Sequence, residues 1–273
     1  MRQIISAEDI RVDGEMKRLY WGFAIIGIPL FILSSSFIVL PWLTFGIIST
    51  AIWIRLQQAK MIGQMMKISN SQFPDINQLA DEAANRLTMK RPDIFIAQTP
   101  VLNAYAIGFF GKKSIVLHSA LIEALEPEEL QSVIGHELTH IKCNHTNLSA
   151  LTSAAGQTAY KFGIPILNQI LGFIFLPWSR YAEYTCDRGG LLACRSLNAA
   201  ISAEIKLVVG AELAKKVDIN EYIKAGEDLD KDKFAKFSEN WETHPYSLNR
   251  VRMLLNFYHS PEYNKLSGDP LLT

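Results

Sequence analysis

The sequence is poor in cysteine and has no excess of charge of either sign. Its three cysteines, Cys143, Cys186 and Cys194, are an odd number without CxxC spacing, which disfavours both a disulfide framework and a cysteine-rich metal site. Free thiols in a reducing compartment are the simplest interpretation. The 27 basic residues equal the 27 acidic residues in number, so no net charge favours nucleic acid or an acidic substrate as a partner.

Charged side chains are also absent from residues 19–54. One straight helix over this stretch would measure about 54 Å, nearly twice the ~30 Å hydrocarbon core of a bilayer. We therefore predict a transmembrane helical hairpin over residues 19–55, bent near Ser34–Ser36 or Pro41; a re-entrant hairpin and a buried helical pair are the alternatives. Basic residues flank it on both sides, which predicts a multi-pass inner-membrane protein with both flanks in the cytoplasm.

The rest of the chain divides by its residue patterns. Residues 1–18 form an N-terminal cytoplasmic segment, residues 56–73 a linker helix, and residues 74–273 one folded domain. Three short segments, at 93–98, 103–109 and 114–118, are rich in β-branched and aromatic residues and predict a small antiparallel sheet. A turn is expected at Gly111–Lys113, between the last two strands. The expected fold class is α+β and mainly helical.

The pattern HExxH at residues 136–140 is the clearest chemical signal. Pro127, with two glutamates behind it, marks the start of a helix. On that helix His136 and His140 lie four residues apart and can reach one metal ion. Glu137 falls about 100° round the axis, beside the metal, where a general base would stand. The pattern alone leaves open an ordinary helix with two surface histidines.

A catalytic zinc takes three protein ligands, so a third is sought elsewhere in the chain. The stretch 143–179 is apolar, and we expect it to form a hydrophobic hairpin that packs on the domain or enters the bilayer interface over residues 162–178. A new helix is expected to open at Ser179, with Glu183 and Asp187 on one face. Glu183 would bind the metal and Asp187 would accept a hydrogen bond from a ligand histidine; a solvated carboxylate pair is the alternative.

Two further residues near these motifs are given other interpretations. Continued helix geometry places His145 about 140° round from His140, on the apolar stripe, so His145 is expected in the core rather than on the metal. Cys186 adjoins the expected site and could compete for the metal, although a buried free thiol is its default interpretation.

Four motifs in order make the chain resemble the membrane-associated M48 peptidases, the group that contains the Ste24-type CAAX prenyl protease and the heat-shock protease HtpX. They are Asn103-Ala-Tyr-Ala106, Leu125-x-Pro-Glu-Glu-Leu-(x)5-His-Glu-Leu-Thr-His140, Ser179-Arg-x-x-Glu-x-x-x-Asp187 and Thr243-His-Pro-(x)4-Arg250. The resemblance implies a zincin-type metallopeptidase domain with one zinc ion per chain, bound by His136, His140 and Glu183.

The resemblance also implies roles that spacing does not provide. His244 would donate a hydrogen bond to the oxyanion, and Arg250 would hold the carboxylates of the Glu183 helix in place. The strand residues Asn103, Ala104, Tyr105 and Ala106 would accept the backbone of an extended peptide as an added β-strand.

The sequence as a whole predicts a membrane-anchored, zinc-dependent endopeptidase with polypeptide substrates, the lipid bilayer as a partner and no nucleic-acid partner. Glu137 would accept the proton of a zinc-activated water. Quality control of membrane proteins or misfolded proteins would suit such an enzyme. The alternatives are a non-catalytic membrane adaptor that keeps the fold for binding, against which the intact Glu137 argues, and a structural zinc site.

Overall fold

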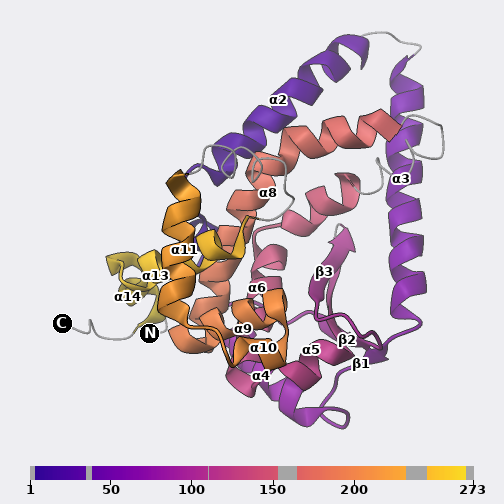
Figure 1. Ribbon diagram of the computed structural model, residues 1–273. Coiled ribbons are helices and arrows are strands. Elements are labelled where there is room, and N and C mark those ends of the chain that lie inside the picture. Colours follow the sequence, from indigo (N-terminus) through magenta and orange to yellow (C-terminus); the bar gives the residue numbers. More distant parts are fainter. Residues whose placement is uncertain (1–3, 35–38, 110, 153–164, 232–244, 269–273) are drawn as a thin grey trace.

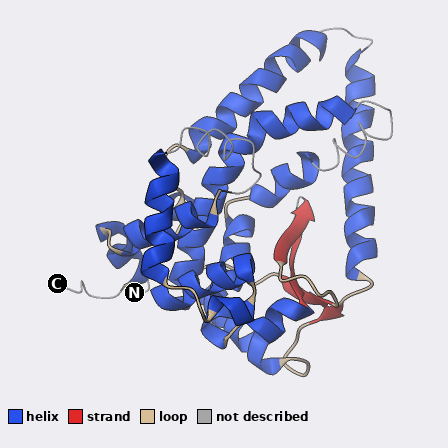
Figure 2. Cartoon of the chain, in the orientation of Figure 1, coloured by secondary structure: helices blue, strands red, loops and turns tan. Residues whose placement is uncertain are grey.

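The computed structural model describes residues 4–34, 39–109, 111–152, 165–231 and 245–268. Helices predominate, and the strands form one small sheet (Figures 1 and 2). The helices are α1 (Ala7–Ile10), α2 (Glu15–Ser34), α3 (Val39–Ile62), α4 (Pro74–Arg86), α5 (Ser119–Ala124), α6 (Pro127–Lys142), α8 (Pro165–Cys194), α9 (Leu197–Val209), α10 (Ala211–Ala214), α11 (Ile219–Lys231), α13 (Ser247–Tyr258) and α14 (Pro261–Ser267). The strands are β1 (Met66–Lys67), β2 (Asp93–Ala97), β3 (Ala104–Phe109) and β4 (Lys112–His118). The expected mainly helical α+β class is confirmed.

The sheet is mixed, so the expectation of an antiparallel sheet is wrong. The strand order is β1-β2-β4-β3. Strands β2 and β4 pair in parallel, with Ile94 opposite Ile115, whereas β3 and β4 form the expected antiparallel hairpin around Gly111, whose φ is 88°. After β2 the chain forms β3 at the edge of the sheet, and β4 then inserts between β2 and β3. Alternation of apolar residues identifies each strand but not the strand that fills the centre, and β3 is left at an edge.

Residues 19–55, expected as a helical hairpin, lie in α2 and α3. The first helix ends at Ser34 and the second begins at Val39, close to the predicted bend. Figure 1 shows α2 extending away from the sheet, whereas α3 runs alongside β3 and contacts it. Within the described ranges, no helix combines the length and the apolar character that crossing a membrane requires. The transmembrane character of the hairpin is therefore not confirmed.

The linker helix expected over residues 56–73 is only partly helical. Helix α3 ends at Ile62, and Met66 and Lys67 then pair with β2 as the short strand β1. This pairing continues in a hydrogen bond from the Ile68 amide to the Ile94 carbonyl, which leaves the Ile68 side chain 1% exposed. Burial of that side chain favours the extended backbone over a further turn of helix.

Helix α8 is continuous from residue 165 to residue 194. The expectation that a new helix opens at Ser179 is therefore wrong. Pro177 lies inside α8, and a proline in a helix interior costs about 3 kcal/mol because one backbone hydrogen bond is lost. Packing offsets this cost, since Phe175 and Trp178 are buried with Leu148 and against α2. Residues 153–164 of the expected apolar hairpin lie outside the described part of the chain.

Helix α6 lies in the main hydrophobic core and packs on α4, α8, α9 and the sheet. It begins with Pro127 in its first turn, as the sequence predicted, and with reciprocal hydrogen bonds between Glu126 and Glu129. Helices α6 and α8 approach closely because glycines lie at their contact: a Cβ at Gly189 would lie 1.8 Å from Oγ1 of Thr139. This approach brings the acidic residues of α8 to the HExxH face of α6.

Candidate metal centre

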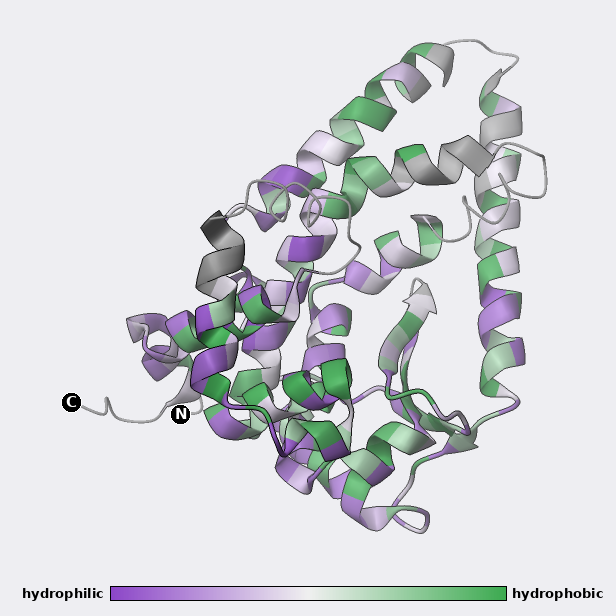
Figure 3. Cartoon of the chain, viewed as in Figure 1, coloured by the Kyte–Doolittle hydropathy of each residue, from purple (hydrophilic) through white to green (hydrophobic). Residues whose placement is uncertain are grey.

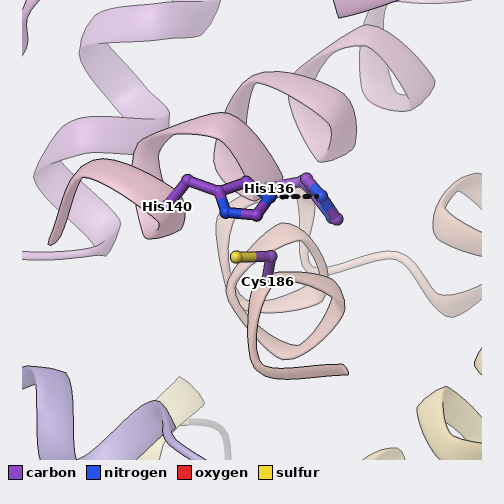
Figure 4. A group of neighbouring side chains, drawn as sticks. All are labelled: His136, His140 and Cys186. Carbon is purple, nitrogen blue, oxygen red and sulfur yellow. Dashed lines mark hydrogen bonds between the residues drawn. The ribbon is translucent and has the colours of Figure 1, made fainter. Parts of the chain in front are cut away.

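Helix α6 presents His136 and His140 on one face, with their Nε2 atoms 3.2 Å apart. Figure 4 shows the two imidazole rings next to each other, with the sulfur of Cys186 beside them. Both side chains are largely shielded from solvent. The arrangement follows from the helix itself, because residues four apart lie one turn above each other.

Helix α8 adds a carboxylate to this pair. One oxygen of Glu183 lies 3.5 Å from Nε2 of His136, and the other lies 3.5 Å from Nε2 of His140. Cys186 on the same helix also reaches the pair: its sulfur and one nitrogen of each histidine lie within 4.8 Å of one another. The two side chains are therefore competing candidates for a third ligand.

The remaining nitrogen of His136 is held by Asp187, whose Oδ1 lies 3.0 Å from Nδ1. Arg250 on α13 donates from Nε and Nη2 to the same carboxylate, at 2.9 and 2.5 Å. Its other terminal nitrogen lies 3.0 Å from Glu204 of α9, a buried carboxylate for which the sequence offers no motif. Asp187 and Arg250 thus lie behind the histidine pair rather than between its Nε2 atoms.

The two histidines differ in their affinity for a proton. Burial opposes the charged form of His136, but hydrogen bonds to Asp187 and Glu183 outweigh it and raise its pKa to about 10. Burial also holds the pKa of His140 well below its ordinary value. A proton on Nε2 of His136 therefore faces a neutral His140 whose Nε2 accepts.

Glu137 lies beside the pair and is 6% exposed. Burial raises its pKa to about 7, against the positive charge of His136 and a hydrogen bond from the backbone of Ala106. A carboxylate with a pKa near neutrality is matched to general-base work. The contact with Ala106 also ties the α6 site to strand β3.

His145 is buried, 2% exposed, as the sequence analysis expected, but its position was derived from a helix that does not continue. Helix α6 ends at Lys142, and Asn144 has a φ of 62°, which redirects the chain. His145 thereby comes within 3.2 Å of His140, Nδ1 to Nδ1, and its Nε2 lies 3.0 Å from Glu15. No local signal could have revealed this contact, because Glu15 lies 130 positions earlier in the chain.

A cavity of about 550 Å³ opens onto these residues. Its lining includes the two histidines, Glu137, Glu183, Asp187 and Arg250, and along one side all four residues of the expected substrate strand, Asn103, Ala104, Tyr105 and Ala106. Because β3 is an edge strand, one of its backbone edges is unoccupied by a neighbouring strand of the described sheet. His244, the expected oxyanion donor, lies outside the described residues.

The sequence profile of peptidase family M48 matches residues 70–257. The chain belongs to this family. Members of family M48 are zinc-dependent metallopeptidases. The matched region contains every residue described above at the histidine pair except Glu15.

Relatives agree with the M48 assignment. The plastoglobule-localized metallopeptidase 48 of Arabidopsis thaliana is 34% identical over 218 residues, which cover 75% of this chain and 63% of that protein. The protease HtpX homolog of Persephonella marina is 25% identical over 235 residues, covering 75% of this chain and 82% of the relative. The crystal structure of S. mikatae Ste24p has a TM-score of 0.48 and 17% identity, covering 88% of this chain and 64% of that one. The chain thus spans less than two thirds of the Arabidopsis protein.

The donor atoms fit the zinc of an M48 peptidase. Ligand atoms 2.0–2.1 Å from a tetrahedral zinc are separated from one another by roughly 3.4 Å. The two Nε2 atoms are 3.2 Å apart, and each lies 3.5 Å from a different oxygen of Glu183, so the separations are close to this value. With His136 and His140 neutral, as metal ligands must be, the formal charges left in the described lining come from four buried carboxylates, at Glu137, Glu183, Asp187 and Glu204, and one arginine. A divalent cation would offset this excess of negative charge.

Proposed function

We propose that the chain is a zinc-dependent endopeptidase in which His136, His140 and Glu183 bind the metal. The observation that carries the proposal is the convergence of these three side chains, with donor separations of 3.2 to 3.5 Å, beside the buried carboxylate of Glu137. Asp187 accepts the Nδ1 proton of His136 and so directs the lone pair of Nε2 toward the metal. Arg250 holds the Asp187 carboxylate in that orientation.

Glu137 is the general base of this proposal. Zinc bound at the site supplies Lewis-acid chemistry, polarising a carbonyl and lowering the pKa of water. The carboxylate of Glu137 takes a proton from the attacking water and passes it to the amine that leaves. Burial, which raises the pKa of Glu137 in the metal-free protein, favours its acceptance of a proton.

Strand β3 is the proposed binding site for the substrate backbone. It is an edge strand that borders the cavity, and its Ala106 amide already bonds to Glu137. An extended peptide added to this edge would place its carbonyls next to the base with little demand on side-chain identity. This mode suits unfolded polypeptide, including misfolded proteins, as a substrate.

The oxyanion role of His244 belongs to the proposal on the strength of the Thr243-His-Pro motif. A donor aimed at the carbonyl oxygen stabilises the charge that develops there during attack. The chain returns to the described part at Pro245, only five positions before Arg250, so the motif lies close in sequence to a residue of the site.

We further propose that α2 and α3 contact a lipid bilayer. Their exposed side chains are largely apolar, and Figure 3 shows hydrophobic residues along α2. Phe31 is 77% exposed and Phe45 is 65% exposed. The same surface contains Tyr20, Trp21, Phe23, Ile25, Ile28, Ile32, Leu40, Ile48, Ile52 and Leu56. Exposed apolar surface of this extent is typical of an interaction site rather than of a solvated one.

The test of the catalytic proposal is Glu137→Gln. The variant is expected to retain zinc while its cleavage of an unfolded polypeptide such as casein falls by about 10²- to 10⁴-fold, the usual loss when a general base is removed. Glu128→Gln is the matched control, because Glu128 lies exposed in the first turn of the same helix. Activity of Glu137→Gln equal to that of the wild type would show that the assigned mechanism is wrong.

The second candidate function, a non-catalytic adaptor, predicts a different result in the same experiment. The wild type would then bind zinc and unfolded polypeptide without cleaving it, and Glu137→Gln would behave in the same way. The position of Glu137 favours the enzyme, because a buried carboxylate beside the metal ligands is costly to keep and an adaptor would need only the ligands.

A further inference from the structure

Glu15, at the start of the apolar helix α2, is buried against His145, which in turn contacts His140. It is 1% exposed and lies at the first residue of α2. Oε2 accepts a hydrogen bond from the Thr185 hydroxyl of α8 at 2.5 Å, and that hydroxyl accepts one from the Val12 amide at 3.0 Å. Arg11 bonds in turn to the Cys143 carbonyl just beyond α6, at 2.9 Å. The position of Glu15 is therefore fixed by the two helices that form the site.

The hydrogen bonds from Glu15 to the site have one consistent direction. An ionised carboxylate only accepts, so Nε2 of His145, 3.0 Å away, donates to Glu15. A neutral imidazole with its proton on Nε2 has an acceptor at Nδ1. His140 must then donate from its own Nδ1, 3.2 Å from that atom, and its Nε2 is left with the lone pair.

The groups around His145 favour this arrangement of hydrogen bonds. Arg11 lies 3.3 Å from the Glu15 oxygen and supplies the positive charge that the carboxylate needs. The Cys186 sulfur lies 3.5 Å from Nδ1 of His145, so a second group that can donate is directed at the same acceptor. Trp178 packs edge-on against the ring, with centroids 5.5 Å apart, and limits its rotation.

We propose that Glu15 and His145 are positioning residues that hold His140 in the tautomer whose Nε2 faces the metal. This inference rests on the proposed zinc site. Asp187 accepts a hydrogen bond directly from Nδ1 of His136. Glu15 would fix the tautomer of His140 in the same way through the imidazole of His145. The inference also makes the first turn of α2 part of the surroundings of the metal centre.

The experiment measures zinc affinity by competition with a chromophoric chelator, on the full-length protein, together with the absorption spectrum of the Co²⁺-substituted form. Glu15→Ala and His145→Phe are each expected to weaken zinc binding about 10- to 100-fold, the range for loss of a hydrogen-bond partner behind a ligand histidine. The double variant is expected to lose no more than either single one, because the two residues act as one unit. The cobalt spectrum is expected to change with them.

Conservative variants separate positioning from mere packing. Glu15→Gln keeps an oxygen that accepts from His145, and His145→Asn keeps an acceptor near the place of Nδ1, so both are expected to bind zinc more tightly than their disruptive counterparts. Glu262→Gln is the control. Glu262 of α14 pairs with Arg188 of α8 at 3.2 Å and contacts neither His145 nor His140 in the hydrogen bonds described. Melting of the zinc-free proteins reports folding separately.

Two outcomes would overturn the inference. One is a zinc affinity of His145→Phe within about twofold of that of the wild type, together with an unchanged cobalt spectrum. Loss of a hydrogen-bond partner behind a ligand histidine ordinarily weakens metal binding about 10- to 100-fold. The other is equal weakening by His145→Phe and His145→Asn, which would indicate packing alone. Failure of the wild type itself to bind zinc would instead refute the proposed function.

Discussion

An oxygen of Asp187 lies 3.0 Å from Nδ1 of His136. This contact, with Glu183 on the other side of the ring, raises the pKa of His136 to about 10 in the metal-free protein despite its burial. At neutral pH the imidazole consequently carries a proton on the nitrogen that the metal would occupy. Zinc binding and protonation of His136 therefore compete.

The first prediction concerns this competition. Because the ligand must be neutral, zinc binding is expected to release about one proton, and apparent affinity is expected to rise roughly tenfold per pH unit as pH increases toward the pKa of His136. Calorimetry in buffers of different ionisation enthalpy measures the released proton. Asp187→Asn removes the carboxylate that raises the pKa, so it should reduce the release at neutral pH. Affinity that does not change between about pH 6 and pH 9 would contradict the prediction.

A second prediction distinguishes the two candidates for the third ligand. Glu183→Ala is expected to reduce bound zinc from one ion per chain to nearly none, while Cys186→Ser retains it. The reason is that both Glu183 oxygens lie 3.5 Å from histidine nitrogens, whereas burial raises the pKa of Cys186 well above its ordinary value and disfavours the thiolate. Elemental analysis of purified protein gives the zinc content. The reverse pattern would assign the site to the histidines and Cys186.

The contact between α6 and α8 yields a third prediction. Gly189→Ala would place a Cβ 1.8 Å from Oγ1 of Thr139, so the helices must separate. We expect a loss of about 1–3 kcal/mol in the free energy of unfolding, as for other overpacked cores, with weaker zinc binding because Glu183 moves away from the histidines. Gly172→Ala on the same helix is the control, since no heavy atom lies within 4 Å of its added Cβ. Similar stability of the two variants would contradict the argument.

The fourth prediction tests the apolar surface. Full-length protein is expected to float with phosphatidylcholine vesicles in a density gradient. The double variant Phe31→Ser/Phe45→Ser is expected to bind vesicles more weakly, by roughly tenfold or more for each side chain, because burial of a phenylalanine contributes about 2 kcal/mol. Leu213→Ser is the control, because Leu213 is 58% exposed but lies on α10. Equal flotation of the control and the double variant would remove α2 and α3 from the proposal.

The sequence was sufficient wherever the relevant signal is local. Pro127 marks a helix start because a residue in the first turn needs no backbone N–H for a helical hydrogen bond. The spacing of His136 and His140 places both rings on one face of α6 whatever surrounds them. The turn at Gly111 is likewise local, since a φ of 88° favours glycine. These features required no knowledge of distant parts of the chain.

Features that depend on tertiary packing escaped the sequence analysis. A new helix was expected to open at Ser179, but packing of Phe175 and Trp178 keeps α8 continuous through Pro177. The neighbourhood of His145 was extrapolated along a helix that ends at Lys142. Glu15 and Glu204 belong to no sequence motif. A single glutamate does not reveal which distant side chain will donate a hydrogen bond to it or neutralise its charge.

The continuity of α8 has a mechanical consequence. Phe175 and Trp178, which pack against α2, and the carboxylates of Glu183 and Asp187 lie on one uninterrupted helix. No loop separates these parts of the helix, although Pro177 lies between Phe175 and Trp178, so a shift of the apolar end can reach the two carboxylates through helical backbone. The candidate metal centre is thereby linked to the packing of the apolar helices through the backbone of one helix.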